Sequence, residues 1–256
     1  MEKKKMPASL LLAFFPALGG APAMAQTAAQ PSAPAAGSSQ YANALHLAYV
    51  LTPSQSINTE SRSGLTGLAE EIGKKTAVVP KGVVGIDIER DEIAVFPFIY
   101  WPVSANSPRL SEKAQKKVQN YINTGGMIVF DTGYAGGNAQ SALANMLGNV
   151  IIKPLVPMGK NHTLTKSFYL VSDLAGSRNG TVWVEAPGAR GTENVSSVII
   201  SDKMWARAWT GMAAQPNEEE RNRILRSGIN MVMYALTGNY KEDQIHIPSI
   251  LERLNR

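Results

Sequence analysis

The sequence contains no cysteine. Thiol catalysis, thiolate metal sites and a lipid anchor on a cysteine are therefore excluded. A large excess of one charge is also missing. The formal net charge is +5, and the first 25 residues, with three lysines and one glutamate, account for +2 of it, which leaves +3. The other basic residues are mostly scattered, and the groups at 113–117 and 221–226 have the spacing of a solvated helix face. We therefore expect no nucleic-acid partner.

Long apolar runs are lacking as well. Beyond the N-terminus no segment approaches 18 consecutive apolar residues, so we expect a soluble mature protein without a transmembrane segment. The N-terminus has a positive stretch at 3–5, a short apolar stretch at 10–18 and an Ala-x-Ala sequence at 23–25. It has no twin arginine. The sequence therefore predicts a signal peptide over residues 1–25, cleaved before Gln26, and export to the periplasm through the general secretory pathway.

The next segment has no charge. Residues 26–40 are rich in alanine, proline, serine and glutamine. Such a composition buries too little apolar surface to offset the entropy of ordering, so these residues are predicted to be a disordered linker. Residues 41–256 are then predicted to form a single α/β domain, which is long enough to bury a core without disulfides or metals.

Short apolar runs alternate with helical patterns along this domain. The pattern predicts strands at 44–51, 77–79, 83–88, 93–103, 127–130, 167–171, 181–184 and 195–200. It predicts helices at 59–75, 111–124, 139–147, 217–237 and 248–254. This alternation is typical of a doubly wound, mainly parallel sheet with helices on both faces. The strand at 127–130 is expected at its centre, because it is apolar throughout.

Five segments, in the same order, resemble one uncharacterised bacterial family. The segments are LHLAYV (45–50), FPFIYWPV (96–103), GGMIVFDT (125–132), HTLTKSFYL (162–170) and GINMVMYALTGNYK (228–241). The family is a domain of unknown function, number 4159, often found at the C-terminal end of large Bat-type membrane proteins encoded near MoxR ATPases. The resemblance implies a fold but no activity, because the family's function is not established.

The pattern of helix, Gly-Gly, strand and aspartate from Ser111 to Asp131 carries a wider resemblance. It is similar to class I glutamine amidotransferase-like proteins, which are related to flavodoxins, and it implies their fold. Catalytic members need a cysteine at a strand–helix elbow, paired with a histidine. Here the stretch after the corresponding strand reads Asp131-Thr132-Gly133-Tyr134. Amidotransferase activity is therefore excluded.

Ligands of open α/β sheets bind beyond the carboxyl ends of the strands, which selects the candidate site residues. Asp131 and His162 could form an acid–base pair, in which one group orients the other during proton transfer. Two ordinary structural roles compete with this reading. Asp131 could cap the turn that follows it, and His162 could satisfy buried backbone groups at a strand entry.

The other candidates also have two readings. Ser61 and Arg62 could hold an anion at a helix start, or Ser61 could simply cap that helix. Aromatic residues at strand ends could line a pocket or pack in the core. The ligand-binding candidates are Ser61, Arg62, Tyr100, Trp101, Asp131, His162, Asp202 and Trp205. The three histidines lack metal-ligand spacing, so no metal and no cofactor are expected.

Two functions remain open. The first is an exported, non-catalytic binding or assembly domain that recognises an unidentified ligand or a periplasmic or membrane protein. The second is a hydrolase that uses Asp131 and His162 at the carboxyl end of the sheet. The missing nucleophile favours the first.

Overall fold

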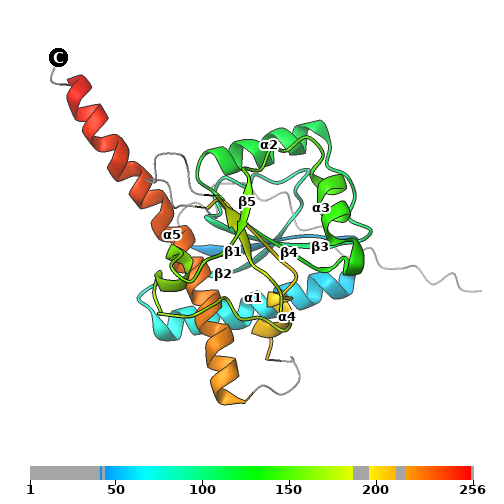
Figure 1. Ribbon diagram of the computed structural model, residues 1–256. Coiled ribbons are helices and arrows are strands. Elements are labelled where there is room, and N and C mark those ends of the chain that lie inside the picture. Colours follow the sequence, from blue (N-terminus) through cyan, green and yellow to red (C-terminus); the bar gives the residue numbers. More distant parts are fainter. Residues whose placement is uncertain (1–40, 42–43, 187–195, 212–216, 255–256) are drawn as a thin grey trace, which may run out of the picture. The chain divides into compact units, whose positions relative to one another are not determined.

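The computed structural model describes residues 41, 44–186, 196–211 and 217–254, with side chains described as far as Thr237 (Figure 1). The predicted signal peptide at 1–25 and the predicted linker at 26–40 lie outside the described residues.

Within the described residues, seven strands form one sheet in the order β2-β1-β3-β4-β7-β6-β5. The strands are β1 (His46–Val50), β2 (Gly82–Ile86), β3 (Phe98–Ser104), β4 (Met127–Tyr134), β5 (Leu155–Pro157), β6 (Trp183–Glu185) and β7 (Val198–Ser201). The pairs among β2, β1, β3, β4 and β7 are parallel, whereas β6 pairs antiparallel with both β7 and β5. The predicted α/β class with a mainly parallel sheet is confirmed, and β4 is central as expected.

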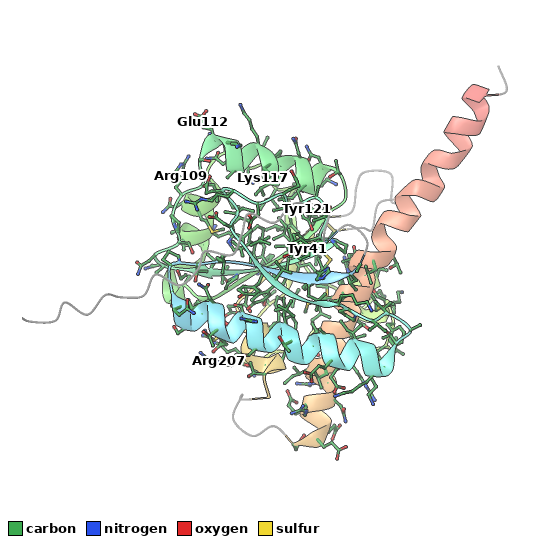
Figure 2. The ribbon with its side chains drawn as sticks, turned by 180° about the vertical axis from the view of Figure 1, so that it is seen from behind. Tyr41, Arg109, Glu112, Lys117, Tyr121 and Arg207 are labelled. Carbon is green, nitrogen blue, oxygen red and sulfur yellow. The ribbon has the colours of Figure 1, made fainter. Side chains whose placement is uncertain are left out.

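Helices cover both faces of this sheet. They are α1 (Gln55–Lys75), α2 (Glu112–Asn123), α3 (Ala139–Leu147), α4 (Trp205–Trp209) and α5 (Glu218–Leu254), with short 3₁₀ turns η2 (Gly136–Asn138) and η3 (Thr163–Lys166). Side chains of α1, α4 and α5 form one apolar core with the sheet, and side chains of α2 and α3 form the other. In Figure 1 and Figure 2, α2 and α1 accordingly lie on opposite sides of the sheet.

Alternation along β3 divides its aromatic residues between the two cores. Tyr100 faces α1, α4 and α5, whereas the next residue, Trp101, faces α2 and α3. Trp101 is 3% exposed and its ring centroid lies 5.3 Å from that of Phe130 on β4. On the same side, the hydroxyl of Tyr121 (Figure 2) donates to the carbonyl oxygen of Phe96 at 2.6 Å and fixes α2 against the start of β3.

Two glycines bring α4 directly against α1. A Cβ at Gly64 would overlap the carbonyl oxygen of Ala206, and one at Gly67 would lie 2.8 Å from that of Trp209. Only a residue without a side chain allows this approach of the two backbones. The contact holds α4 beside the carboxyl ends of the strands.

Several predicted elements are wrong in their bounds or existence. Residues 77–79 and 167–171 form no strand, and 93–97 form a turn before β3. Ile93 and Phe96 are nevertheless buried in the α2–α3 core, so their apolar character reflects burial rather than strand pairing. Helix α1 begins four residues earlier than predicted, and α5 runs on through the predicted stop at Gly238 to include the predicted terminal helix.

Candidate functional site

A pocket of about 640 Å³ lies at the carboxyl ends of β4 and β7. Its floor is apolar and comes from the sheet and α3. Register pairs Trp183 of β6 with Ile200 of β7, so both side chains lie on the α3 side of the sheet. Leu155 of β5 and Leu143 of α3 complete this floor. The volume falls in the range of ordinary small-molecule sites. We call it the carboxyl-edge pocket.

The rim of this pocket is polar. It carries Gln140, Arg178, Thr181 and Asp202, which come from α3, from the loop before β6 and from the end of β7. The guanidinium of Arg178 donates to the carbonyl oxygen of Gly133 at 3.4 Å. Its backbone N–H donates to the carbonyl oxygen of Lys203, one residue after Asp202, so the two charged residues belong to adjoining segments.

Gly180 determines where the carboxylate of Asp202 lies. A Cβ at Gly180 would overlap Oδ1 of Asp202, so the carboxylate rests directly against this loop backbone. Among the described residues, no ion pair within 4.0 Å joins Asp202 to Arg178 or to any other cation. Both charges are therefore available at the rim.

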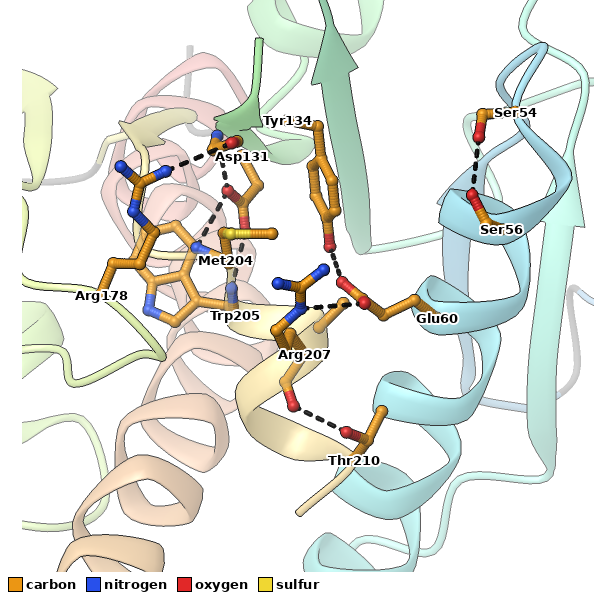
Figure 3. A network of polar contacts seen from close by, with 12 residues as sticks. Ser54, Ser56, Glu60, Asp131, Tyr134, Arg178, Met204, Trp205, Arg207 and Thr210 are labelled. Atoms are coloured by element: carbon orange, nitrogen blue, oxygen red, sulfur yellow. Dashed lines mark hydrogen bonds and ion pairs between the residues drawn. The ribbon is translucent and has the colours of Figure 1, made fainter. Parts of the chain in front are cut away.

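Asp131 lies close to the pocket but is itself fully buried (Figure 3). Its Oδ1 accepts from the backbone N–H groups of Gly133 and Met204, at 3.1 and 3.2 Å. Its Oδ2 accepts from the Tyr100 hydroxyl at 2.8 Å and from the N–H of Trp205 at 2.7 Å. Burial raises the pKa of Asp131 to about 6, although the hydrogen bonds oppose the rise. Asp131 thus joins β4 to β3 and to the turn that precedes α4.

The polar contacts continue toward α1, as Figure 3 shows. The Tyr134 hydroxyl donates to Oε1 of Glu60 at 2.5 Å, and Nε of Arg207 lies 3.0 Å from Oε2 of the same carboxylate. Burial and the neighbouring Asp131 and Glu60 raise the pKa of Tyr134 well above its usual value. Burial, with Asp131 as the next cause, likewise raises the pKa of Tyr100. This network ties the end of β4 to α1 and α4.

His162 lies at the other end of the sheet. Its Nε2 is 3.5 Å from Oγ of Ser196, which precedes β7, whereas Asp131 pairs in register with the last residue of β7. The four residues of β7 alone span about 10 Å at 3.3 Å per residue. Asp131 and His162 are therefore not brought together, and the acid–base pair expected from the sequence does not form.

His162 has a structural role of its own. It occupies the N-cap of η3, where its Nδ1 accepts from the N–H of Leu164 at 3.2 Å. Burial lowers its pKa. A neutral imidazole that accepts at Nδ1 carries its proton on Nε2, which faces Ser196. It therefore donates toward that hydroxyl and cannot serve as its base.

The remaining candidates are placed as follows. Ser61 is fully buried inside α1, whose N-cap is Ser54, so the expectation that Ser61 and Arg62 begin a helix is wrong. Arg62 is exposed. Trp205 is buried at the start of α4, and Tyr100 and Trp101 are core residues. Of the eight predicted site residues, Asp202 alone lines the carboxyl-edge pocket.

Sequence reasoning missed Arg178, Gln140 and Trp183. Arg178 comes from a glycine-rich loop with no periodic pattern, and only the structure shows that this loop folds over the end of β7. Gln140 lies on a helix that was predicted. It lines a pocket only because the antiparallel strands β5 and β6 extend the sheet beside that helix, and the sequence did not indicate this pairing. The one usable signal in the sequence was the position of Asp202 after a predicted strand.

In the described part of the chain, no group of three or more histidine, aspartate or glutamate side chains is arranged to hold a metal ion. No helix among the same residues is long and apolar enough to cross a membrane.

Comparison with curated proteins returns no match. A protein-family model does match, over residues 46–236, which includes every strand of the sheet and the whole carboxyl-edge pocket. This agrees with the family expected from the five sequence segments. The chain belongs to the family described as domain of unknown function (DUF4159).

Proposed function

We propose that this protein is an exported domain that binds a small ligand in the carboxyl-edge pocket without turning it over. The observation that carries the proposal is that the hydrogen-bonding capacity of Asp131 is already used within the protein. This buried carboxylate directly precedes Thr132, which lines the pocket, and both of its oxygens already accept two hydrogen bonds each from protein donors. Asp131 holds the turn before α4 against the end of β4, beside the pocket, and it has no free lone pair directed at a substrate.

The pocket also lacks an activated nucleophile among its described residues. Thr132 lies in the stretch 131–134 that the resemblance matches to the amidotransferase elbow, and its hydroxyl donates to the carbonyl oxygen of Ser201 at 3.2 Å. Acyl transfer needs a nucleophile paired with a base, and the described histidines of this chain lie elsewhere. An apolar floor with a few polar groups on the rim is what a binding site requires.

The strand order of the sheet supports the same proposal. The parallel strand order 2-1-3-4 with helices on both faces is that of flavodoxin-like sheets, to which the amidotransferase-like proteins are related. The pocket lies at the carboxyl end of β4, on the edge of the sheet where open α/β sheets bind ligands. The sequence of residues 1–25 supports export, where the domain would meet a periplasmic or membrane-protein partner.

The experiment measures turnover and binding on the same protein. The purified chain is incubated with amide, ester and glycoside substrates, and ligand binding is followed by calorimetry. Gln140→Trp fills the pocket mouth from an exposed position on α3, and Ser141→Trp, also exposed but outside the pocket, is its matched control. We expect binding that Gln140→Trp abolishes and Ser141→Trp preserves, with no turnover. Turnover that Gln140→Trp abolishes would overturn the proposal.

A further inference from the structure

The rim of the carboxyl-edge pocket presents one cation and one anion that do not neutralise each other. Arg178 is exposed, and its guanidinium makes one long hydrogen bond, to Gly133. Asp202 is half-buried and, within the described residues, its carboxylate has neither a hydrogen bond nor an ion pair. From these charges and the apolar floor we propose that the ligand is an apolar α-amino acid. This inference rests on the proposed binding function and names its ligand class.

The two charges select a dipolar ligand over a singly charged one. A planar guanidinium binds a carboxylate through two parallel hydrogen bonds, and an aspartate accepts from an ammonium group. A simple carboxylate bound at Arg178 would lie near Asp202 and be repelled by it, and a simple amine at Asp202 would be repelled by Arg178. A molecule that carries both groups on one carbon satisfies both residues.

The two charged groups have different contacts and form no ion pair with each other. Arg178 extends toward the end of β4, where it meets the Gly133 carbonyl, while the Asp202 carboxylate rests on Gly180. Their main chains are nevertheless linked, because the N–H of Arg178 donates to the carbonyl oxygen of Lys203. The charges therefore stand on adjoining segments without closing on each other.

The floor fixes the nature of the ligand's side chain. Leu143, Leu155 and Ile200 are aliphatic, and Trp183 is 39% exposed beside them. A sugar would place hydroxyl groups against this surface without partners, which is unfavourable. An aliphatic or aromatic side chain would instead be buried there.

The test compares L-leucine with its two truncated forms, 4-methylpentanoate, which lacks the ammonium, and 3-methylbutylamine, which lacks the carboxylate. D-glucose is the uncharged probe. Calorimetry on the full chain should show leucine binding at least about tenfold more tightly than either truncated form, since each loses one charged contact. Phenylalanine should bind in the same manner.

Two variants assign the charges to the ends of the ligand. Arg178→Gln should weaken leucine binding at least about tenfold and leave 3-methylbutylamine unchanged or tighter. Asp202→Asn should weaken leucine similarly and leave 4-methylpentanoate unchanged or tighter. Gly180→Ala should resemble Asp202→Asn, because the new methyl group displaces the carboxylate. Arg90→Gln and Glu70→Gln, at positions outside the pocket, are the controls and should leave leucine binding unchanged.

The possible failures are distinguishable. Absence of leucine and phenylalanine binding, or equal binding of leucine and both truncated forms, overturns the ligand class. Glucose binding that Gln140→Trp abolishes overturns the ligand class but leaves the proposed binding function intact. Hydrolytic turnover that Gln140→Trp abolishes overturns the proposed function itself.

Discussion

The substitution Asp131→Asn tests the central claim that this residue is a structural acceptor with a shifted pKa. The change is nearly isosteric: it removes the titrating proton and replaces one carboxylate oxygen by an amide nitrogen. Each carboxylate oxygen accepts from two donors, and an amide has only one oxygen. Whichever way the amide is turned, two donors face its nitrogen. On the Oδ2 side one of them is the N–H of Trp205, which has no other acceptor at that position.

The expected magnitude depends on pH. Below pH 6 the carboxyl of Asp131 is protonated in the folded protein. Its hydroxyl oxygen then donates to Tyr100 and still accepts from Trp205, whereas an amide nitrogen accepts nothing. At pH 5 the Asn variant should therefore be less stable by about 2 kcal/mol, the cost of one buried unpaired donor. This corresponds to a melting temperature about 4–8 °C lower.

As the pH rises, this difference should shrink. The folded pKa of about 6 lies above the ordinary value of 3.8, so the folded state binds the proton more tightly than the unfolded state. The stability from this proton is complete below pH 3.8 and is lost as the pH rises through 6. The full loss is about 3 kcal/mol, of which most falls between pH 4 and pH 8. About 1.4 kcal/mol of it is lost between pH 5 and pH 8, so at pH 8 the deficit of the Asn variant should fall to about 0.6 kcal/mol.

Urea denaturation of wild type and variant between pH 4 and pH 8 measures this difference directly. Glu70→Gln is the control, because it makes the same acid-to-amide change at an exposed position on α1. It should change the free energy of unfolding by less than about 0.5 kcal/mol. A wild-type-to-Asn difference that stays constant with pH would refute the raised pKa. No loss of stability at pH 5 would refute the acceptor argument.

Three further outcomes follow from the sequence and structure. Gly64→Ala should destabilise the fold by about 3 kcal/mol or more in thermal or urea unfolding, because the new Cβ overlaps the Ala206 carbonyl. Gly73→Ala is its control on the same helix. It places its Cβ in open space and should stabilise the fold by about 0.5–1 kcal/mol. Ser111→Ala should cost about 1 kcal/mol in the same assay, since it removes the N-cap that accepts from Ala114. Mass spectrometry of the protein expressed from its full gene should find Gln26 at the mature N-terminus; an intact Met1 in the cytosol would contradict export.

The sequence predicts those helices and strands whose capping residues and apolar pattern match the side chains that are buried in the fold. Helix α2 follows this rule, because Ser111 accepts from Ala114 at its start and Val118 lies on its buried face. The central strand does so as well, since every residue from Met127 to Phe130 is buried. Predictions fail where apolar residues are buried without joining the sheet. They also fail in the apolar segment 167–171, where Tyr169 is half-buried and its backbone N–H and carbonyl are satisfied by the side chain of Asn230 rather than by a strand.

The candidate site was predictable only in part, because its residues meet through tertiary packing. Asp202 follows a strand and was found from that position. Arg178 reaches the same pocket from a loop whose path is set by the backbone bond to Lys203. The expected pairing of Asp131 with His162 failed for a related reason. Both residues are near the sheet, but the sequence did not indicate that His162 lies at the amino end of β7 and Asp131 opposite its carboxyl end.

The buried acid and the pocket rim are parts of one arrangement. Met204 is the one described residue other than glycine with a positive φ, 51°, a conformation that costs roughly 1–2 kcal/mol. Asp131 accepts from the N–H groups of Met204 and Trp205 and so holds this turn in place. The turn follows directly after Asp202 and Lys203. Asp202 is the acidic residue of the rim, and the carbonyl oxygen of Lys203 accepts from the backbone N–H of Arg178, the basic residue. The Asp131 carboxylate thus stabilises a strained turn beside the rim of the carboxyl-edge pocket, which explains why it is fully buried and why both of its oxygens accept hydrogen bonds.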